Sequence, residues 1–488
     1  MPFPCSGIRE FIEDLKKENE LIDVDQEVDW NLEVGAITRR LCETGLGRKV
    51  GEGGVPAVLF NNIKGYHGHR ICAQTHASVY RLAMMFGHPE PGKANMEDIQ
   101  NLFIKAIDNP IKPAVVSNAP CKENKLFGDD CNLFDFPAPM VHEGDGGRYM
   151  CTFHLVATKD PDSDWTNWGM YRSMIQDRRS LGGIFIPFQH GPSIYFQKYE
   201  PKNKPMPFAI SIAPDPLSLL FSATPVPAGV SEMDVVGGAR GKPLEVVKCE
   251  TNDILVPASS EIIIEGIIPP YVRAQEGPFG EYMGYRASGR DLRPVYVVKA
   301  ITYRNNPILS MSNMGTPVDD GDLCWGLGTV ASLKRDLLRN NLPVKAVNMM
   351  PEASGNLIVI STETPYPRIA QRIMATVFSN SNSQYVASYL IVNEDVDVFN
   401  PFEVLFVWAS RVHPENGVHV YHQTGNPLAP YGSMEERLNL TAPQIVYDAT
   451  WPVLWPKQDV PLVSSFKKLY PKEMQEKVIS NWQKYGFK

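Results

Sequence analysis

The chain has 488 residues, of which 43% are hydrophobic and 21% charged, a composition typical of a soluble globular protein with several domains. Its net charge of −8 and its lack of dense Lys/Arg runs argue against nucleic acid or an anionic membrane as the main partner. Eight scattered cysteines without a CxxC pair, no signal-peptide pattern and no apolar run of about 18 residues lead us to expect a cytoplasmic protein with reduced thiols.

The first 110 residues alternate between helical and strand patterns. A helix is predicted over 7–21, with Ser6 as its N-cap and Ile8, Phe11, Ile12 and Leu15 on its inner face. A second helix is predicted over 32–45, ended by Gly45, with Leu32, Ile37 and Leu41 facing inward. PAVLFNNIKG then predicts a strand and a turn. Residues 1–110 are therefore predicted to form an α/β domain.

Residues 111–315 are dominated by strand-like runs. These are PAVVSN, TFHLVATKD, FAISIA, EIIIEGII and VYVVKAITYR, separated by glycines and prolines. This part of the chain predicts a β-rich barrel or sandwich with inserted helices.

Helical patterns return after residue 315. A linker helix is predicted within 316–345, with Val330, Leu333, Leu337 and Leu338 on one face. Residues 346–450 predict a second α/β unit, with a helix on Ile369, Ile373, Met374 and Val377 and with YLIVNEDVDV and VLFVWAS as buried strands. The tail, 451–488, carries Met474, Val478 and Trp482 at helical spacing, and this stripe could pack on its own chain or on a partner subunit. The fold class is α/β (α+β).

Three polar residues stand at the ends of apolar or aromatic stretches. Asn167 lies between two tryptophans in DWTNWGMYR, His190 ends IFIPFQH, and Glu232 follows PVPAGVS. An amide oxygen, an imidazole and a carboxylate form a mixed ligand set that suits Mg²⁺ or Mn²⁺, especially when phosphate oxygens complete it. A tryptophan-anchored turn and a packed histidine are the alternatives. Neither a P-loop nor a GxGxxG motif is found, so a nucleotide-like cofactor would be held in another way.

The stretch EGPFGEYMGY, residues 276–285, carries two glutamates five positions apart. A regular helix or a straight strand would point Glu276 and Glu281 away from each other, so convergence requires the bends at the glycines and the proline. If both met Arg172, the guanidinium would keep one ionised and leave a proton on the other, the pairing that acid/base chemistry needs. A solvated surface turn is the alternative.

In this order, TNWGMYR, IPFQHG, PAGVSEMD and EGPFGEYMGY resemble motifs of the UbiD family of (de)carboxylases, and LEVGAITRRLCET, HEGDGGRYM and NWQKYGF extend the resemblance over most of the chain. Glu281 stands where the ubiquinone branch usually has Asp, so the chain is more similar to the ferulate and heteroaromatic acid branch. The resemblance implies an N-terminal α/β domain, a split β-barrel flavin-binding domain, a linker helix and a C-terminal α/β oligomerisation domain.

The resemblance also implies a cofactor and its ligands. The cofactor is prenylated FMN, supplied by a flavin prenyltransferase. Asn167, His190 and Glu232 would hold a divalent metal, Mn²⁺ or Mg²⁺, that bridges to the cofactor phosphate beside K⁺. The other residues that match cofactor contacts are Gly169, Met170, Arg172 and Gln189.

The family's Glu-Arg-Glu network matches Glu276, Arg172 and Glu281. Arg172 would orient the substrate carboxylate and Glu276, and Glu281 would protonate the carbon that has lost CO₂. Positions that match substrate-facing residues are Ile186, Tyr282, Trp325 and Trp408, and two tryptophans favour a flat ring. Phe402 stands where ferulate-type members can carry a lysine, which puts one cofactor contact in doubt.

We therefore expect a homodimeric or larger decarboxylase that acts reversibly on an aromatic or heteroaromatic acid. One alternative is a cinnamate- or ferulate-type acrylic acid decarboxylase. Another is a metal-dependent hydrolase built on His190 and Glu232, which would need an open metal position. The third is a non-catalytic flavin-binding subunit, against which the intact glutamate pair argues.

Overall fold

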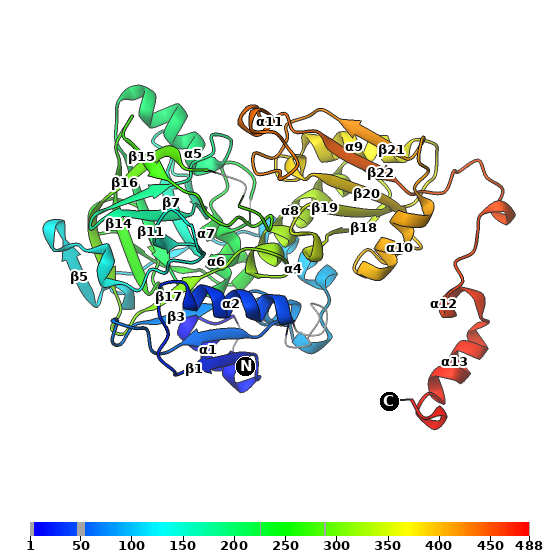
Figure 1. The fold of residues 1–488 in the computed structure, drawn as a ribbon, viewed down its shortest axis with the longest axis horizontal. Helices are drawn as coiled ribbons and strands as arrows, with labels where there is room; N and C mark the ends of the chain where they lie inside the picture. The colour runs from blue at the N-terminus through cyan, green and yellow to red at the C-terminus, as the bar shows by residue number, and fades with distance from the viewer. Residues whose placement is uncertain (1–3, 46–53, 225, 287–288, 488) are drawn as a thin grey trace.

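Figure 1 shows the computed structural model, which describes residues 4–45, 54–224, 226–286 and 289–487. The chain has a mixed α/β fold with a small N-terminal sheet, a curled central sheet and a C-terminal sheet, and a tail leads away from this body. The predicted fold class, with a curled and partly open barrel, is confirmed. None of the helices in the described ranges is both long and apolar enough to span a membrane.

The N-terminal sheet has the strand order β1-β2-β3-β17, and its last strand, β17 (Ile308–Met311), comes from much later in the chain. The other elements of this part are α1 (Ile8–Lys17), β1 (Leu21–Val24), α2 (Glu33–Thr44), β2 (Ala57–Phe60), β3 (Arg70–Ala73), α3 (Val79–Met85) and α4 (Met96–Asp108). The inner face predicted for α1 is confirmed.

Two details of these helices differ from the prediction. Gly7 is the N-cap of α1, because Ser6 donates to the Glu10 carboxylate instead. In α2 the fully buried residues include Val34, Thr38 and Cys42, so the inner face lies about one position away from the predicted one. Gly45 ends α2 in the left-handed conformation, as predicted.

The central sheet has ten strands, with the path β6-β9-β10-β16-β14-β11-β7-β8 and with β5 and β15 paired to β16. Its strands are β5 (Asn124–Phe127), β6 (Tyr149–Cys151), β7 (His154–Lys159), β8 (Thr166–Gly169), β9 (Ser173–Asp177), β10 (Ser180–Gly183), β11 (Met206–Ile212), β14 (Ile262–Ile268), β15 (Arg273–Glu276) and β16 (Asp291–Tyr303). Helices α5 (His190–Ile194), α6 (Pro216–Ser222) and α7 (Glu232–Arg240) contact β7 or β8. A small sheet is formed by β4 (Ala114–Val115), β12 (Glu245–Lys248) and β13 (Leu255–Pro257). The strands predicted from EIIIEGII and VYVVKAITYR are confirmed as β14 and β16.

The C-terminal sheet has the order β18-β19-β20-β22-β21. Its elements are β18 (Val344–Met349), β19 (Leu357–Thr362), α9 (Ile369–Ser379), β20 (Ser388–Asn393), α10 (Pro401–Arg411), β21 (Val418–Tyr421), α11 (Met434–Asn439) and β22 (Gln444–Asp448). The prediction of a strand at VLFVWAS is wrong, because this segment forms α10. Asn400 caps it by accepting from the amides of Phe402 and Glu403, and Pro401 occupies the first turn.

Helix α8 (Asp320–Arg339) connects two hydrophobic cores. Leu323 and Leu327, in its first half, belong to the large core of the N-terminal and central parts. Leu333 and Leu337, in its second half, belong to the core of the C-terminal sheet. Leu338, predicted on the same inner face, is 48% exposed, so that assignment is wrong.

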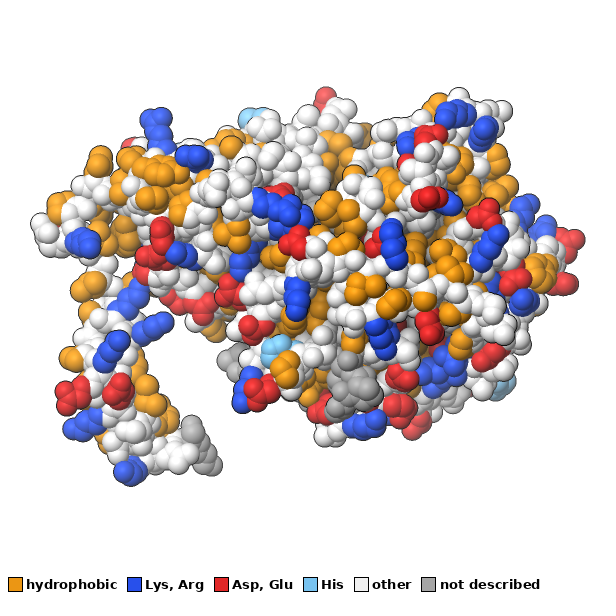
Figure 2. Space-filling model, turned by 180° about the vertical axis from the view of Figure 1, so that it is seen from behind, with side chains coloured by type: hydrophobic (Ala, Val, Ile, Leu, Met, Phe, Trp, Pro, Cys, Tyr) orange, Lys and Arg blue, Asp and Glu red, His pale blue; other side chains and the backbone are white. Residues whose placement is uncertain are grey.

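The tail contains α12 (Phe466–Leu469) and α13 (Lys472–Ser480) and stands away from the body in Figure 1. Lys468 binds the Asp395 carboxylate at 2.5 Å and ties the base of the tail to the C-terminal part. Met474 and Trp482 are 44% and 45% exposed, so the predicted stripe is not covered by its own chain. Figure 2 shows hydrophobic side chains along this tail.

Candidate active site

Arg172 lies between the two glutamates, as the sequence hypothesis required. Its Nε donates to Glu276 Oε1 at 3.0 Å and its Nη2 to Oε2 at 2.9 Å, while its Nη1 contacts Glu281 Oε1. The three side chains are buried; the most accessible is Arg172, at 9%. Two carboxylates and one guanidinium would carry one excess negative charge in a site of low dielectric constant, so we expect the cluster to hold a proton.

Two glycines shape the turn that returns Glu281 to Arg172. Gly277, directly after β15, has a φ of +85°, which L side chains rarely adopt, and a Cβ there would lie 2.7 Å from the Gly289 carbonyl oxygen. At Gly280 a Cβ would lie 2.6 Å from Cε1 of His142. Larger residues at these positions would displace the turn, so the bends that the sequence hypothesis needed are present.

Asn167, His190 and Glu232 come from three elements that meet at the edge of the central sheet. Asn167 lies in β8, and the other two are the first residues of α5 and α7. Glu232 Oε2 accepts a hydrogen bond from the Trp168 amide at 2.7 Å, and its Oε1 accepts one from Asn167 Nδ2 at 3.1 Å. The His190 ring stands edge-on to Trp165, at 5.3 Å between ring centroids.

The chemistry of these three residues fits a divalent cation. Burial raises the pKa of Glu232 to about 8, and a bound cation would remove that penalty on its ionised form. Burial lowers the pKa of His190, which favours the neutral imidazole that ligates metals. In the described part of the chain, His, Cys, Asp and Glu alone form no group of three that could hold a metal, so a site here depends on the Asn167 amide oxygen.

A cavity of about 310 Å³ opens between the central sheet and the C-terminal part. The predicted site residues that line it are Asn167, Gly169, Met170, Ile186, Gln189, His190, Glu232, Tyr282 and Trp325. The rings of Tyr282 and Trp325 lie 4.9 Å apart between centroids. Gln189 Oε1 is buried and has no hydrogen-bond partner among the described residues, which fits an acceptor that awaits a ligand.

The Glu276–Arg172–Glu281 cluster is connected to this cavity through its neighbours in the chain. Arg172 follows Tyr171 and Glu281 precedes Tyr282, and both tyrosines line the cavity, whereas Arg172, Glu276 and Glu281 themselves are not among the lining residues. The cavity and the cluster therefore share the chain segments at 171–172 and 281–282.

Trp408, which the resemblance placed toward the substrate, is not among the residues that line this cavity; it lies on α10, with its ring 5.4 Å from that of Tyr447 between centroids. Phe402, where the resemblance left a cofactor contact in doubt, lies at the start of α10 and is 75% exposed.

Sequence reasoning missed Tyr149 and Tyr171 as parts of the site. Tyr149 donates to Glu276 Oε1 at 2.7 Å, and the Tyr171 hydroxyl donates to Asn167 Oδ1 at 3.1 Å. Tyr149 belongs to the segment HEGDGGRYM, which carried part of the family resemblance, so its place in a motif was the available signal. Its partner lies 127 positions away in the chain.

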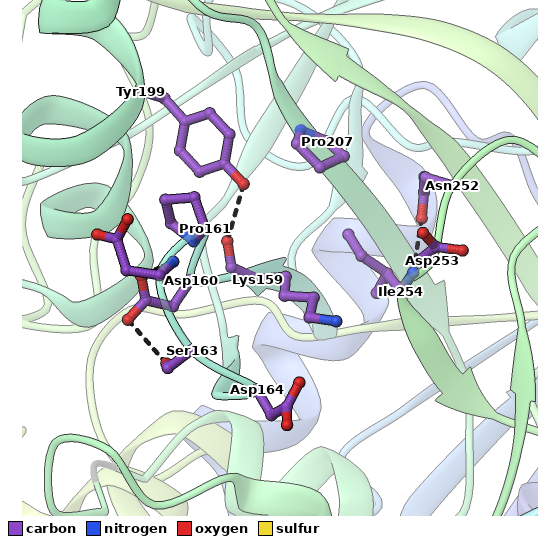
Figure 3. Close-up of a pocket in the computed structure, with 11 residues that line it drawn as sticks. Lys159, Asp160, Pro161, Ser163, Asp164, Tyr199, Pro207, Asn252, Asp253 and Ile254 are labelled. Carbon is purple, nitrogen blue, oxygen red and sulfur yellow. Dashed lines mark hydrogen bonds between the residues drawn. The ribbon is translucent and has the colours of Figure 1, made fainter.

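A second hollow, shown in Figure 3, holds none of the predicted site residues. It lies around Lys159, Asp160, Tyr199 and Asp253, and the Tyr199 hydroxyl donates to the Lys159 carbonyl at 3.2 Å. Asp160 is bound by Lys198 at 2.7 Å. The carboxylates of this hollow make it a poor place for a phosphate group, so the cavity beside Asn167 remains the candidate site.

The chain matches three family models that together span most of its length. These describe the N-terminal, Rift-related and C-terminal domains of 3-octaprenyl-4-hydroxybenzoate carboxy-lyase, over residues 12–102, 114–317 and 324–449. The chain is 33% identical to pyrrole-2-carboxylic acid decarboxylase of Pseudomonas aeruginosa, with 98% of both chains covered. It is 32% identical to ferulic acid decarboxylase 1 of Saccharomyces cerevisiae, with 99% of both covered.

Solved structures show the same fold. Vanillic acid decarboxylase of Sedimentibacter hydroxybenzoicus, in its closed form, superposes with a TM-score of 0.85 at 32% identity, covering 98% of this chain and 99% of that one. HmfF of Pelotomaculum thermopropionicum, a UbiD-class enzyme in complex with FMN, superposes with a TM-score of 0.81 at 28% identity, covering 94% and 97%. This chain therefore belongs to the UbiD family of carboxy-lyases.

Proposed function

We propose that this chain catalyses the reversible, non-oxidative decarboxylation of an aromatic or heteroaromatic acid with prenylated FMN. The observation that carries the proposal is the buried Glu276–Arg172–Glu281 cluster, whose chain neighbours Tyr171 and Tyr282 line a cavity with aromatic walls. The similarity to pyrrole-2-carboxylic acid and ferulic acid decarboxylases supports this reaction class, and the FMN and prFMN complexes of HmfF support the cofactor.

The residues of the cluster then have distinct tasks. Prenylated FMN, when bound, supplies an electron sink for the pair left when the bond to CO₂ breaks. Arg172 orients the substrate carboxylate while it holds Glu276. Glu281 donates its proton to the carbon that has lost CO₂, and takes a proton back when the reaction runs toward the acid at high bicarbonate. Tyr282 and Trp325 hold a flat ring by stacking.

The cavity also offers residues for the cofactor and its ions. In the proposal Asn167, His190 and Glu232 would hold Mn²⁺ or Mg²⁺, which together with K⁺ would supply positive charge for the cofactor phosphate. Gly169, Met170 and Gln189 line the same cavity and contact the cofactor itself. The raised pKa of Glu232 and the unpaired Gln189 oxygen support this assignment.

The proposal is tested by co-expression with a flavin prenyltransferase and a screen of aromatic acids, with hydroxybenzoates and indole-, pyrrole- and furan-type carboxylates first, for CO₂ release. Glu281→Gln should keep cofactor and metal and lose turnover; full activity of this variant would remove Glu281 as the proton donor. His190→Ala should lower Mn²⁺ and flavin content together. His419→Ala, in β21 away from the cavity, is the matched control, and equal metal and flavin content in both variants would refute the metal assignment.

The same preparation separates the rival functions. A hydrolase would cleave esters without flavin absorbance, and a non-catalytic subunit would bind flavin but release no CO₂ from any acid in the screen. Release of CO₂ from cinnamates but not from ring carboxylates would favour the acrylic acid alternative.

We further propose that two or more copies assemble through the C-terminal part. On α10, Phe402, Leu405 and Phe406 are 75%, 58% and 54% exposed, and the tail presents a further apolar stripe. Apolar area of this kind on one helix and its neighbouring tail is typical of a subunit interface. The evolved dimeric form of HmfF supports association in the family. Phe402→Asp with Leu405→Asp should lower the mass measured by light scattering; an unchanged mass would refute this interface.

A further inference from the structure

The two glutamates of the cluster have different hydrogen-bond surroundings. Glu276 accepts three hydrogen bonds, two from Arg172 and one from the Tyr149 hydroxyl. Glu281, by contrast, has Arg172 as the one side chain of the described residues that contacts its carboxylate. An ionised carboxylate only accepts, and donors aimed at it favour the ionised form. The surroundings of Glu276 therefore suit an anion better than those of Glu281.

Tyr149 is held firmly in this role. It is fully buried at the start of β6, its amide donates to the Pro139 carbonyl at 3.0 Å, and its ring packs on Phe279 at 4.3 Å between centroids. Phe279 lies inside the turn between the two glutamates. Burial raises the pKa of Tyr149, so its hydroxyl keeps its proton and remains a donor at neutral pH.

Two further hydrogen bonds hold the backbone of the same turn. The Gly146 amide donates to the Pro278 carbonyl at 2.8 Å, and Arg290 Nε donates to the Gly277 carbonyl at 3.2 Å. Besides Glu276, the charged groups that influence Tyr149 are Arg172 and Asp145. Tyr149 thus belongs to a fixed frame around the turn, and its hydroxyl is the contact of that frame with the Glu276 carboxylate.

We propose that Tyr149 is a positioning residue that holds Glu276 as the ionised member of the pair and so leaves the transferable proton on Glu281. This inference rests on the proposed function, since it assigns the proton that the decarboxylation requires. Arg172 contacts both carboxylates, with two hydrogen bonds to Glu276 and one contact to Glu281, so its charge stabilises the ionised form of either one. Tyr149 adds to the difference between them, because its hydroxyl reaches Glu276 alone of the two.

The test compares Tyr149→Phe with Tyr195→Phe in holoenzyme loaded with cofactor. Tyr195 is a matched control: it is also fully buried, its hydroxyl donates to Glu200 at 2.9 Å, and Glu200 is bound by Arg273 at 2.7 Å, outside the cavity. Both variants remove one hydroxyl from a Tyr-Glu-Arg arrangement. The rate of CO₂ release is measured against pH, and melting temperatures show whether each variant is folded.

Loss of the Tyr149 hydroxyl makes ionised Glu276 less favourable, so the pair binds its protons more tightly. The low-pH limb of the pH–rate profile of Tyr149→Phe should move to higher pH by up to about one unit, the size expected from one hydrogen bond to a charged group. The high-pH limb should move by less, because the proton lost there comes from Glu281, and the maximal rate should fall at most about twofold, because part of the proton moves to Glu276. Tyr195→Phe should keep the wild-type limbs. A Tyr149→Phe profile of unchanged position, lowered only in height, would overturn the proposal.

A second measurement needs no turnover, and its first step needs no Tyr149 variant. In the apoprotein, Glu281→Gln should remove an infrared carbonyl band of a buried, protonated carboxyl group; if it removes none, Glu281 does not hold the proton and the inference fails. In the Tyr149→Phe background the same substitution should remove less of this band. If loaded wild type releases no CO₂ from any acid, the proposed function fails, while the infrared result still decides the position of the proton.

Discussion

Asp320 provides a quantitative test of the structure at the wall of the cavity. It is the first residue of α8, one position before Gly321 and five before Trp325, which both line the cavity. Its Oδ1 accepts from the His76 amide at 2.6 Å, and its Oδ2 has no hydrogen-bond partner among the described residues. Burial raises the pKa of this carboxyl from 3.8 to about 7.

The sign of the effect follows from linkage. Because the pKa of Asp320 is higher in the folded than in the unfolded chain, the stability it contributes is fully present below pH 3.8 and is lost as the pH rises toward 7. At about 1.4 kcal/mol per unit, the shift amounts to about 4 kcal/mol. Asp320→Asn keeps the acceptor for His76 and cannot ionise, so it should become more stable than wild type by up to about 4 kcal/mol at pH 8 and should match it near pH 4.

The assay is urea unfolding of the apoprotein at a series of pH values, with the difference between the two proteins as the readout. Taking the difference cancels the other groups that titrate in the same range. Asp253→Asn is a control of opposite sign, because the pKa of Asp253 is lowered by its hydrogen bond to Lys248. A difference between wild type and Asp320→Asn that does not change with pH would refute the reasoning.

Three further predictions concern the site. Glu276→Gln should cost about 1.5–3 kcal/mol of the free energy of unfolding, because it weakens buried hydrogen bonds to a charged group while Glu281 still pairs with Arg172. Glu200→Gln, in the more exposed Arg273 pair, should cost about 1 kcal/mol or less, and equal losses in urea unfolding would contradict this. Gly280→Ala should lower the rate of CO₂ release about tenfold, because the added methyl group would press on the His142 ring and shift Glu281. An unchanged rate would show that this contact does not position Glu281. Trp325→Ala should raise KM for the acid about tenfold, whereas Trp408→Ala should not change KM; the reverse result would show that the wrong tryptophan was assigned to the cavity.

Much of the fold could be predicted because its signals are local. EIIIEGII and VYVVKAITYR are dense in β-branched residues, and they form β14 and β16 of the central sheet. VLFVWAS has a similar apolar run but forms α10. The signal that distinguishes it, Asn-Pro at 400–401, was present in the sequence and marks a helix start. The buried residues of α10 are Val404 and Val407, about one turn apart, so only one face of this helix is covered. An apolar run alone therefore does not distinguish a buried strand from a helix with one buried face.

The site could be predicted only in part. The spacing of Glu276 and Glu281 shows that the chain must bend for them to converge, and the glycines between them allow that bend. The position of Arg172, in contrast, depends on pairing between strands that are distant in the sequence. Tyr149 could not be assigned, because no spacing rule connects it to a glutamate 127 residues later. Trp408 does not line the cavity in this structure, and its position is set by packing on the C-terminal sheet, which the order of motifs along the chain does not encode.

Helix α8 connects the cavity to the C-terminal sheet. With 20 residues it is about 30 Å long and stiff, and its two halves are anchored in different cores. Gly321 and Trp325 on this helix line the cavity, and Trp325 also packs against the core of the C-terminal sheet. We therefore expect α8 to set the spacing between the two parts of the chain that enclose the cavity, so that a change in either core would alter the width of the substrate slot.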